Sequence, residues 1–368
     1  MEATDCINCT HGGLIDDSGV LIDDRIKNIL SDILFIGAGT FISLFGIISN
    51  IISIAVYVKL GVKDSATVQF LGLSASDCVF SVLVLMSSVS IFFSQIKPDL
   101  TMVDSISFMH LVSATREKTY SVSMCIIFIM SLERCFCVAY PFTIKLIFTR
   151  ARSAIVISCI SIILVVVLIP EYLTKGLTWT FDNKLNTSRL MYWSTRDYRA
   201  AIEVGKNAIL AGLLPLGSGV TVTICTLYMI SAMQASSKFR QRAVVDKCRE
   251  ASSKEKYITK GIKSSEPKTH RLKTDARVTR TVIAVAIVFI LCNIPKCIVV
   301  SHSVVVLYIP DFSLLVEGRY QNLISVLFTI TFIFEALNGA STFIIYYAFS
   351  TKFKTALQHT LRTCINDT

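Results

Sequence analysis

The sequence predicts an all-α membrane protein, built as a seven-transmembrane helix bundle. Hydrophobic residues make up 53% of the 368 residues and charged residues make up 17%, whereas a soluble domain has about 25% charged residues. The hydrophobic residues are collected in long runs with short polar stretches between them, as a lipid bilayer requires. The low charge excludes a soluble globule, and the high hydrophobic content with only 16 Gly and 7 Pro excludes a disordered or collagen-like chain.

Seven stretches are long and apolar enough to cross the bilayer, which takes about 20 residues of helix. They are continuous rather than alternating at every second residue, so membrane strands are excluded. The third is the weakest, because Arg116, Glu117 and Lys118 interrupt its first half. The predicted spans are 33–58, 67–93, 103–138, 153–173, 200–233, 278–307 and 322–349.

Lys and Arg are divided unequally between the two sides of the predicted membrane. The loops after the first, third and fifth spans, with the C-terminal segment, carry 21 of them, and the other loops with the N-terminal segment carry 9. Because basic residues are retained in the cytoplasm, we expect a multi-pass plasma-membrane protein with its N-terminus outside. The expected regions are an extracellular segment 1–32, a transmembrane domain 33–349 and a cytoplasmic segment 350–368.

The third cytoplasmic loop, 234–277, carries 13 Lys and Arg and most of the formal net charge of +10. Few aromatic residues are interleaved and the loop is tied between two spans, so we do not interpret it as a nucleic-acid site. We expect a solvated basic loop beside anionic lipid headgroups, compatible with docking of a cytosolic partner.

Several residues are candidates for covalent modification. Asn8 and Asn186 each begin an Asn-X-Ser/Thr sequon on the predicted outside, and we expect both to be glycosylated. Of the 12 cysteines, Cys6 and Cys9 lie clearly outside, and they bond to each other, bond to another chain or stay free. Cys364 is a candidate for palmitoylation, with an unmodified thiol as the alternative.

Short motifs follow one another along the spans in a specific order. These are Asn50, Asp77, Glu133-Arg134-Cys135, Pro141, Pro215, Phe289-x-x-Cys292-Asn-Ile-Pro295, Asn338, Tyr346 and Phe353. In this order and spacing the chain resembles rhodopsin-like (class A) G-protein-coupled receptors over nearly its whole length. Glu-Arg-Cys-Phe-Cys-Val and the Tyr-Pro-Phe that follows also resemble orphan peptide-type or chemosensory receptors of invertebrates.

The resemblance implies a cell-surface receptor that is not an enzyme. It would bind an extracellular peptide or small-molecule ligand and activate heterotrimeric G proteins. It also implies a short cytoplasmic amphipathic helix around Phe353.

The sequence departs from this family in the second outer loop and in the motifs of the sixth and seventh spans. The family joins its third span to the second outer loop by a disulfide, but Met109 stands at the first cysteine position and residues 174–199 contain no cysteine. Asn293 replaces the Trp two residues before Pro295, and Thr342 replaces the Asn of Asn-Pro-x-x-Tyr. These departures concern the details of activation rather than the fold.

Asp77 is the plainest charged residue within a span. A charge in hydrocarbon costs about 3 kcal/mol or more, so each one is a candidate for function. The resemblance implies a pocket for an allosteric sodium ion, with Asn50, Ser123 and Asn338 facing the carboxylate. The alternative is a hydrogen-bonded polar cluster that holds the helices together.

Arg134 lies at the cytoplasmic rim of the third span. The resemblance implies that Glu133 and Asp275 hold its guanidinium in the inactive state, and such a pair is a releasable latch. Outward movement of the sixth helix, which Pro295 loosens, would free Arg134 for a G protein, with Tyr346 in the same switch. The alternative is that Arg134 only extends to the interface.

Arg116 is the most informative residue for the ligand. It lies five helical turns before Arg134, near the outer mouth, and favours an anionic group such as a carboxylate or a peptide C-terminus. The alternative is an internal ion pair with Glu203 or Glu335 and no ligand. The other residues expected to share the cavity are Tyr120, Glu203, Lys206, Asn207 and Glu335.

Three other classes of protein are weighed against a receptor. A transporter or channel would be supported by paired discontinuous helices and an internal repeat, and the sequence has neither. An opsin needs a lysine in the seventh span to attach retinal, at the position where this chain has Ala336. The only other candidate for this attachment is Lys296, which lies in the sixth span. A membrane enzyme needs paired acids, a nucleophile or a metal cluster at depth, and only Asp77 and Glu335 are deep acids.

Overall fold

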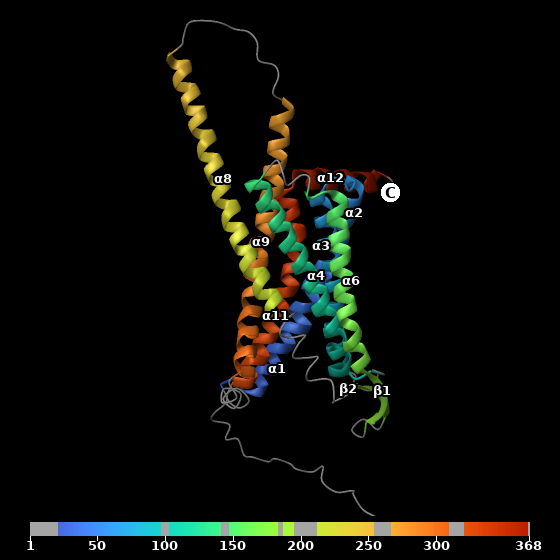
Figure 1. Cartoon of the computed structure of the whole chain (residues 1–368). Helices are drawn as coiled ribbons and strands as arrows, with labels where there is room; N and C mark the ends of the chain where they lie inside the picture. The colour runs from blue at the N-terminus through green and yellow to red at the C-terminus, as the bar shows by residue number, and fades with distance from the viewer. Residues whose placement is uncertain are drawn as a thin grey trace, which may run out of the picture.

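The computed structural model describes residues 21–96, 103–140, 147–182, 187–194, 212–253, 266–308 and 320–366. Within this part of the chain, seven helices are long and apolar enough to cross a membrane. They lie side by side as one bundle (Figure 1). The predicted seven-helix fold is therefore confirmed.

Each predicted span falls on one of these helices. The first span is a continuous run of α1 (Asp24–Asp32), the π-helix η2 (Ile33–Ala38) and α2 (Gly39–Leu60). The other spans are α3 (Ser65–Ile96), α4 (Ser105–Ala139), α6 (Arg150–Thr174), α8 (Leu214–Ser253), α9 (Glu266–Tyr308) and α11 (Gln321–Phe349).

The two ends of the bundle carry different elements. A helix, α12 (Thr351–Asn366), lies across one end, which we call the α12 end (Figure 1). An antiparallel hairpin of β1 (Lys175–Asp182) and β2 (Thr187–Ser194) lies at the other, which we call the hairpin end. The short amphipathic helix is thus confirmed, because α12 buries Phe353 and Leu357 against the bundle and exposes Lys352, Lys354 and Arg362.

At the α12 end, α8 and α9 project beyond the other spans (Figure 1). The helix α8 continues to Ser253 and α9 begins at Glu266, so both extend into the stretch assigned to the 234–277 loop. Hydropathy does not reveal these extensions, because the helices remain regular after their residues become polar.

The helix α4 is unbroken for 35 residues although three charged residues lie in its first half. Each charge has a partner: Arg116 Nη1 lies 3.3 Å from Glu335 Oε2, and Lys118 Nζ lies 3.4 Å from Glu117 Oε2. Asp104 caps the helix, since its Oδ2 accepts a hydrogen bond of 2.9 Å from the Ser107 amide. The pairing offsets the cost of placing charges inside the bundle.

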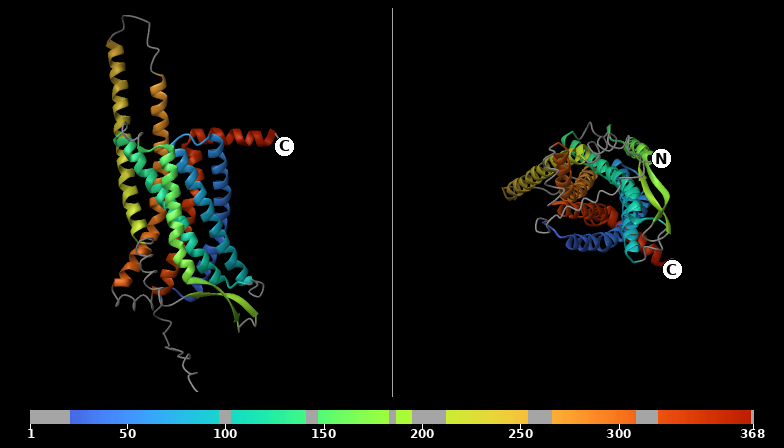
Figure 2. Two further views of the ribbon diagram at one scale, coloured as in Figure 1. Left: turned by 45° about the vertical axis from the view of Figure 1, so that its right-hand side comes forward. Right: turned by 90° about the horizontal axis from the view of Figure 1, so that it is seen from below.

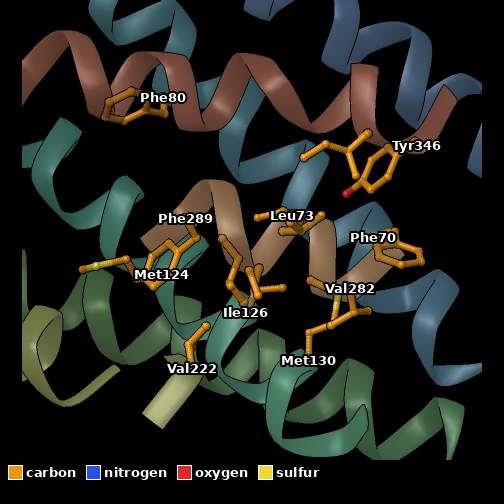
Figure 3. Packing of buried hydrophobic residues seen from close by; sticks show 14 of the residues in the cluster. Phe70, Leu73, Phe80, Met124, Ile126, Met130, Val222, Val282, Phe289 and Tyr346 are labelled. Atoms are coloured by element: carbon orange, nitrogen blue, oxygen red, sulfur yellow. The ribbon is translucent and has the colours of Figure 1, made fainter. Parts of the chain in front are cut away.

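Large apolar side chains fill the middle of the bundle (Figure 3). In a membrane such packing stabilises the fold by close contact between atoms rather than by exclusion of water. The side chains come from α3, α4, α8, α9 and α11 and point toward one another; those labelled are Phe70, Leu73, Phe80, Met124, Ile126, Met130, Val222, Val282, Phe289 and Tyr346.

Small residues allow α2 to approach α3 and α11 closely. A Cβ at Gly46 would lie 2.5 Å from Ser81 Oγ, and one at Gly39 would lie 2.9 Å from Ser88 Oγ. A Cβ at Gly339 would lie 3.4 Å from the carboxyl carbon of Asp77. Close backbone approach of this kind is how helices associate in lipid, and it brings polar groups of α2 and α11 next to Asp77.

Candidate functional site

At the hairpin end, three charged side chains from three helices meet. Arg116 comes from α4, Lys296 from α9 and Glu335 from α11. Lys296 Nζ lies 2.7 Å from Glu335 Oε1, and Arg116 Nη1 lies 3.3 Å from Glu335 Oε2. The side chains of Lys296 and Glu335 are 8% and 9% exposed and that of Arg116 is 19% exposed. We call these three residues the ionic cluster.

Aromatic rings cover both cations of the ionic cluster. Arg116 Cζ lies 4.6 Å from the centre of the Phe332 ring, and Lys296 Nζ lies 4.7 Å from the centre of the Tyr120 ring. Phe332 in turn stacks on Phe35 of η2, with ring centres 4.3 Å apart. Each cation is therefore held by a ring face as well as by the shared carboxylate.

Tyr120 ties the ionic cluster to the core below it. Its hydroxyl donates a hydrogen bond of 3.1 Å to Asn293 Oδ1, and Asn293 Nδ2 donates one of 2.8 Å to the Phe289 carbonyl. Asn293 stands where the family carries Trp, so a polar contact between α4 and α9 replaces an aromatic one. The Tyr120 ring also lies 5.5 Å from that of Phe80 on α3.

The structure brings together three of the residues predicted for the ligand site. Arg116 pairs with Glu335, which was the expected alternative to ligand contact, and Tyr120 flanks the same cluster. The sequence singles out Lys296 only as a position for retinal attachment, although any lysine at membrane depth is a candidate for function. Glu203, Lys206 and Asn207 lie outside the described residues.

Asp77 occupies the middle of the bundle, and hydroxyl groups contact one of its two carboxylate oxygens. Ser123 Oγ donates a hydrogen bond of 2.7 Å to Asp77 Oδ1 and lies 2.8 Å from Ser76 Oγ. Asp77 Oδ2 and Asn338 Nδ2 are buried without a hydrogen-bond partner in the described part of the chain. An unpartnered carboxylate oxygen beside a serine hydroxyl fits a small oxygen-seeking cation such as sodium.

Asn50 supports the Asp77 region through its contacts with α11. Its Nδ2 donates to the Gly339 carbonyl at 3.1 Å, and its Oδ1 accepts from Thr342 Oγ1 at 3.3 Å. Thr342, which replaces the family's Asn, therefore links α2 to α11 through Asn50.

At the α12 end, Glu133 accepts hydrogen bonds from donors on two helices, its own α4 and the neighbouring α3. Its Oε1 accepts from Arg134 Nη2 at 2.6 Å, and its Oε2 accepts from Ser65 Oγ and Gln69 Nε2, each at 2.6 Å. Ser65 Oγ also lies 2.5 Å from Ser153 Oγ, so α3 holds the carboxylate directly and α6 supports Ser65. Sequence reasoning identified Glu133 and Arg134 and missed the residues that position them.

Of the other predicted switch residues, Tyr346 lies in this half, whereas Pro295 lies next to Lys296 of the ionic cluster. Tyr346 is buried, with its ring 5.0 Å from Phe70 and 5.7 Å from Phe353 (Figure 3). Pro295 lies inside the continuous helix α9. Asp275 lies in α9, but its side chain is outside the described ones, as is that of Cys364 in α12.

The hairpin is attached to α4 without a disulfide. Val103 forms a β-bridge with Leu190, and the Asp104 amide donates to the Leu190 carbonyl at 3.0 Å. The Tyr192 amide donates to Ser107 Oγ at 2.9 Å. The hairpin therefore lies beside α4 and α6 at the rim of the bundle (Figure 2). The predicted modification sites Asn8 and Asn186 and the cysteines Cys6 and Cys9 lie outside the described residues.

The seven-helix fold, with one polar site toward each end, defines a membrane receptor of the seven-transmembrane class. Residues 49–346 match the family model described as 7 transmembrane receptor (rhodopsin family). The chain therefore belongs to the rhodopsin family of seven-transmembrane receptors, as its motifs predict. A search among curated proteins finds no match.

Proposed function

We propose that this receptor binds a peptide or small-molecule ligand at the hairpin end and activates a heterotrimeric G protein at the α12 end. The observation that carries the proposal is the state of Arg134, which is 9% exposed and held by Glu133. Its Nε has no hydrogen-bond partner among the described residues, so the guanidinium is only partly satisfied. An arginine in this position is ready to exchange one partner for another.

The orientation of the receptor follows from charge. The α12 end carries the loops that are rich in Lys and Arg, which supports a cytoplasmic location for that end. The hairpin end then faces outside, where a ligand arrives. The plasma membrane is the membrane in which such an orientation exposes the site to extracellular ligands.

Sodium is the ion that we propose for the Asp77 region. Asp77 Oδ2, the Ser123 hydroxyl and the Asn338 amide oxygen would hold it. When bound, the ion would supply a positive charge that neutralises Asp77 and favours the arrangement in which α3, α4 and α11 stay together. The same residues without the ion form a polar cluster that links these helices.

The test of the receptor function is expression in cells with readouts for the main classes of G protein. We expect the wild type to show ligand-independent coupling to at least one of them, and Arg134→Ala to abolish it while surface expression is kept. Arg150→Ala is the matched control, because it removes an exposed arginine of the same end that contacts only the Val62 carbonyl in the contacts described. Normal coupling by Arg134→Ala would contradict the assigned role.

A further inference from the structure

The ionic cluster holds more positive than negative charge. Among the residues that the structure describes, Arg116 and Lys296 bring two cations, and Glu335 brings the one carboxylate that both of them contact. A buried charge is costly unless a partner neutralises it, and one carboxylate cannot fully neutralise two cations. These three side chains can therefore accept one further carboxylate.

Both oxygens of Glu335 are engaged, each by a cation from a different helix. Oε1 contacts Lys296 of α9 and Oε2 contacts Arg116 of α4. Glu335 thereby ties α4 and α9 to α11. Lys296 directly follows Pro295, which lacks the amide that a regular helix uses and loosens α9 at this point.

The cluster is open from one side. Arg116 is 19% exposed, whereas Glu335 is 9% and Lys296 8% exposed, so an incoming group meets Arg116 first. Phe332 and Tyr120 cover one face of each cation and Glu335 contacts both, so a carboxylate that binds both cations competes with Glu335.

We propose that the ionic cluster is a lock on α9, and that a ligand with one free carboxylate opens it by taking Arg116 and Lys296 from Glu335. The proposal rests on the receptor function above. Release of Lys296 allows α9 to tilt about Pro295, and tilting of α9 is what frees Arg134 at the α12 end. The carboxylate belongs to a small organic acid or to a peptide C-terminus, which present the same chemistry.

The lock is tested first without a ligand. Glu335→Gln keeps the side-chain shape and removes the charge that holds both cations, so basal G-protein signalling rises by about fivefold. Lys296→Met leaves the Arg116–Glu335 pair intact and raises basal signalling less. Asp32→Asn is the matched control, because it removes a carboxylate at the same end of the bundle whose Oδ1 accepts a hydrogen bond from Gln95 Nε2, and it leaves basal signalling unchanged.

The second arm tests the ligand class. Benzoate is compared with benzamide, and peptide libraries with free C-termini are compared with the same libraries amidated. Thermal unfolding of the purified receptor is the readout, so this arm does not depend on a G protein. The free acids raise the unfolding temperature of the wild type, the amides do not, and Lys296→Met abolishes the difference. A response to benzoate indicates a small acid, and a response confined to peptides indicates a C-terminus.

The outcomes separate the lock from the receptor function. If Arg134→Ala lowers basal signalling and Glu335→Gln leaves it unchanged with normal surface expression, the lock is wrong and the function stands. If no G protein responds to the wild type or to any variant, the function is wrong and the lock is judged by unfolding. The lock is overturned if acids and amides raise the unfolding temperature of the receptor equally. It is also overturned if the acids still raise that temperature in Lys296→Met.

Discussion

The two ends of the bundle each place a buried glutamate against a cation, but they do so in different ways. Glu133 pairs with the neighbouring residue of its own helix, and side chains of α3 and α6 hold it in place. Glu335 has its partners on two other helices, α4 and α9. The first arrangement positions one arginine, whereas the second ties helices together. A site that responds to a ligand must be able to move helices. A site that binds a partner protein must instead hold a side chain in a defined position.

Removal of Glu133 should produce the largest effect on stability. Glu133→Ala leaves Arg134, Ser65 and Gln69 without their shared acceptor inside the bundle, and breaking such a buried pair costs about 3 kcal/mol or more. Thermal unfolding in detergent measures the loss. Glu133→Gln retains one acceptor oxygen and should lose less; equal stability of wild type and Glu133→Ala would show that Glu133 holds nothing in place.

Substitution of Arg116 should change the preference between ligands. Arg116→Ala removes a charged donor, worth about 2 kcal/mol to an anionic group and little to a neutral one. Paired binding of a carboxylate ligand and its amide measures the difference. Arg25→Ala, which removes an exposed positive charge at the same end, is the control. Equal loss of affinity for acid and amide would count against a role for the Arg116 charge.

Sodium should stabilise the receptor through Asp77. At a concentration about tenfold above its dissociation constant, a bound ion adds about 1.4 kcal/mol to the free energy of unfolding. Unfolding in sodium chloride is compared with unfolding in choline chloride at the same ionic strength. The difference should vanish in Asp77→Asn; a difference that persists in this variant places the ion elsewhere.

The attachment of the hairpin should show the smallest effect. Ser107→Ala removes the acceptor of the Tyr192 amide, a bond worth about 1 kcal/mol. Hydrogen exchange within β2 should become faster, and the bulk of α4 should be unaffected. Ser113→Ala, on an exposed hydroxyl of the same helix, is the control. Unchanged exchange in β2 would mean that the β-bridge to Val103 is sufficient by itself.

The sequence predicts the fold well because each span carries its own signal. Even α4 is found, although its first half is charged, since the apolar run from Val122 to Ile129 marks it. The Asp77–Ser123 contact and the Glu133–Arg134 pair follow from motifs whose spacing is known for the family.

The contacts between helices are harder to predict. Lys296 and Glu335 are 39 residues apart on different helices, and their contact depends on how α9 and α11 are rotated against each other. The sequence does not encode that rotation in any local pattern. The hairpin was predictable in principle, because Leu177, Trp179 and Phe181 alternate with threonines, but the missing cysteine gives no hint that Ser107 takes over the attachment.

The central claim is that the state of the ionic cluster at the hairpin end controls the position of α9 at the α12 end. The direct test is the distance between spin labels at positions 59 on α2 and 280 on α9, where Lys59 and Arg280 are exposed. We expect Glu335→Gln to shift the distribution to longer distances, as an activating carboxylate ligand would in the wild type. An unchanged distribution in Glu335→Gln, measured in a folded receptor, would contradict this claim.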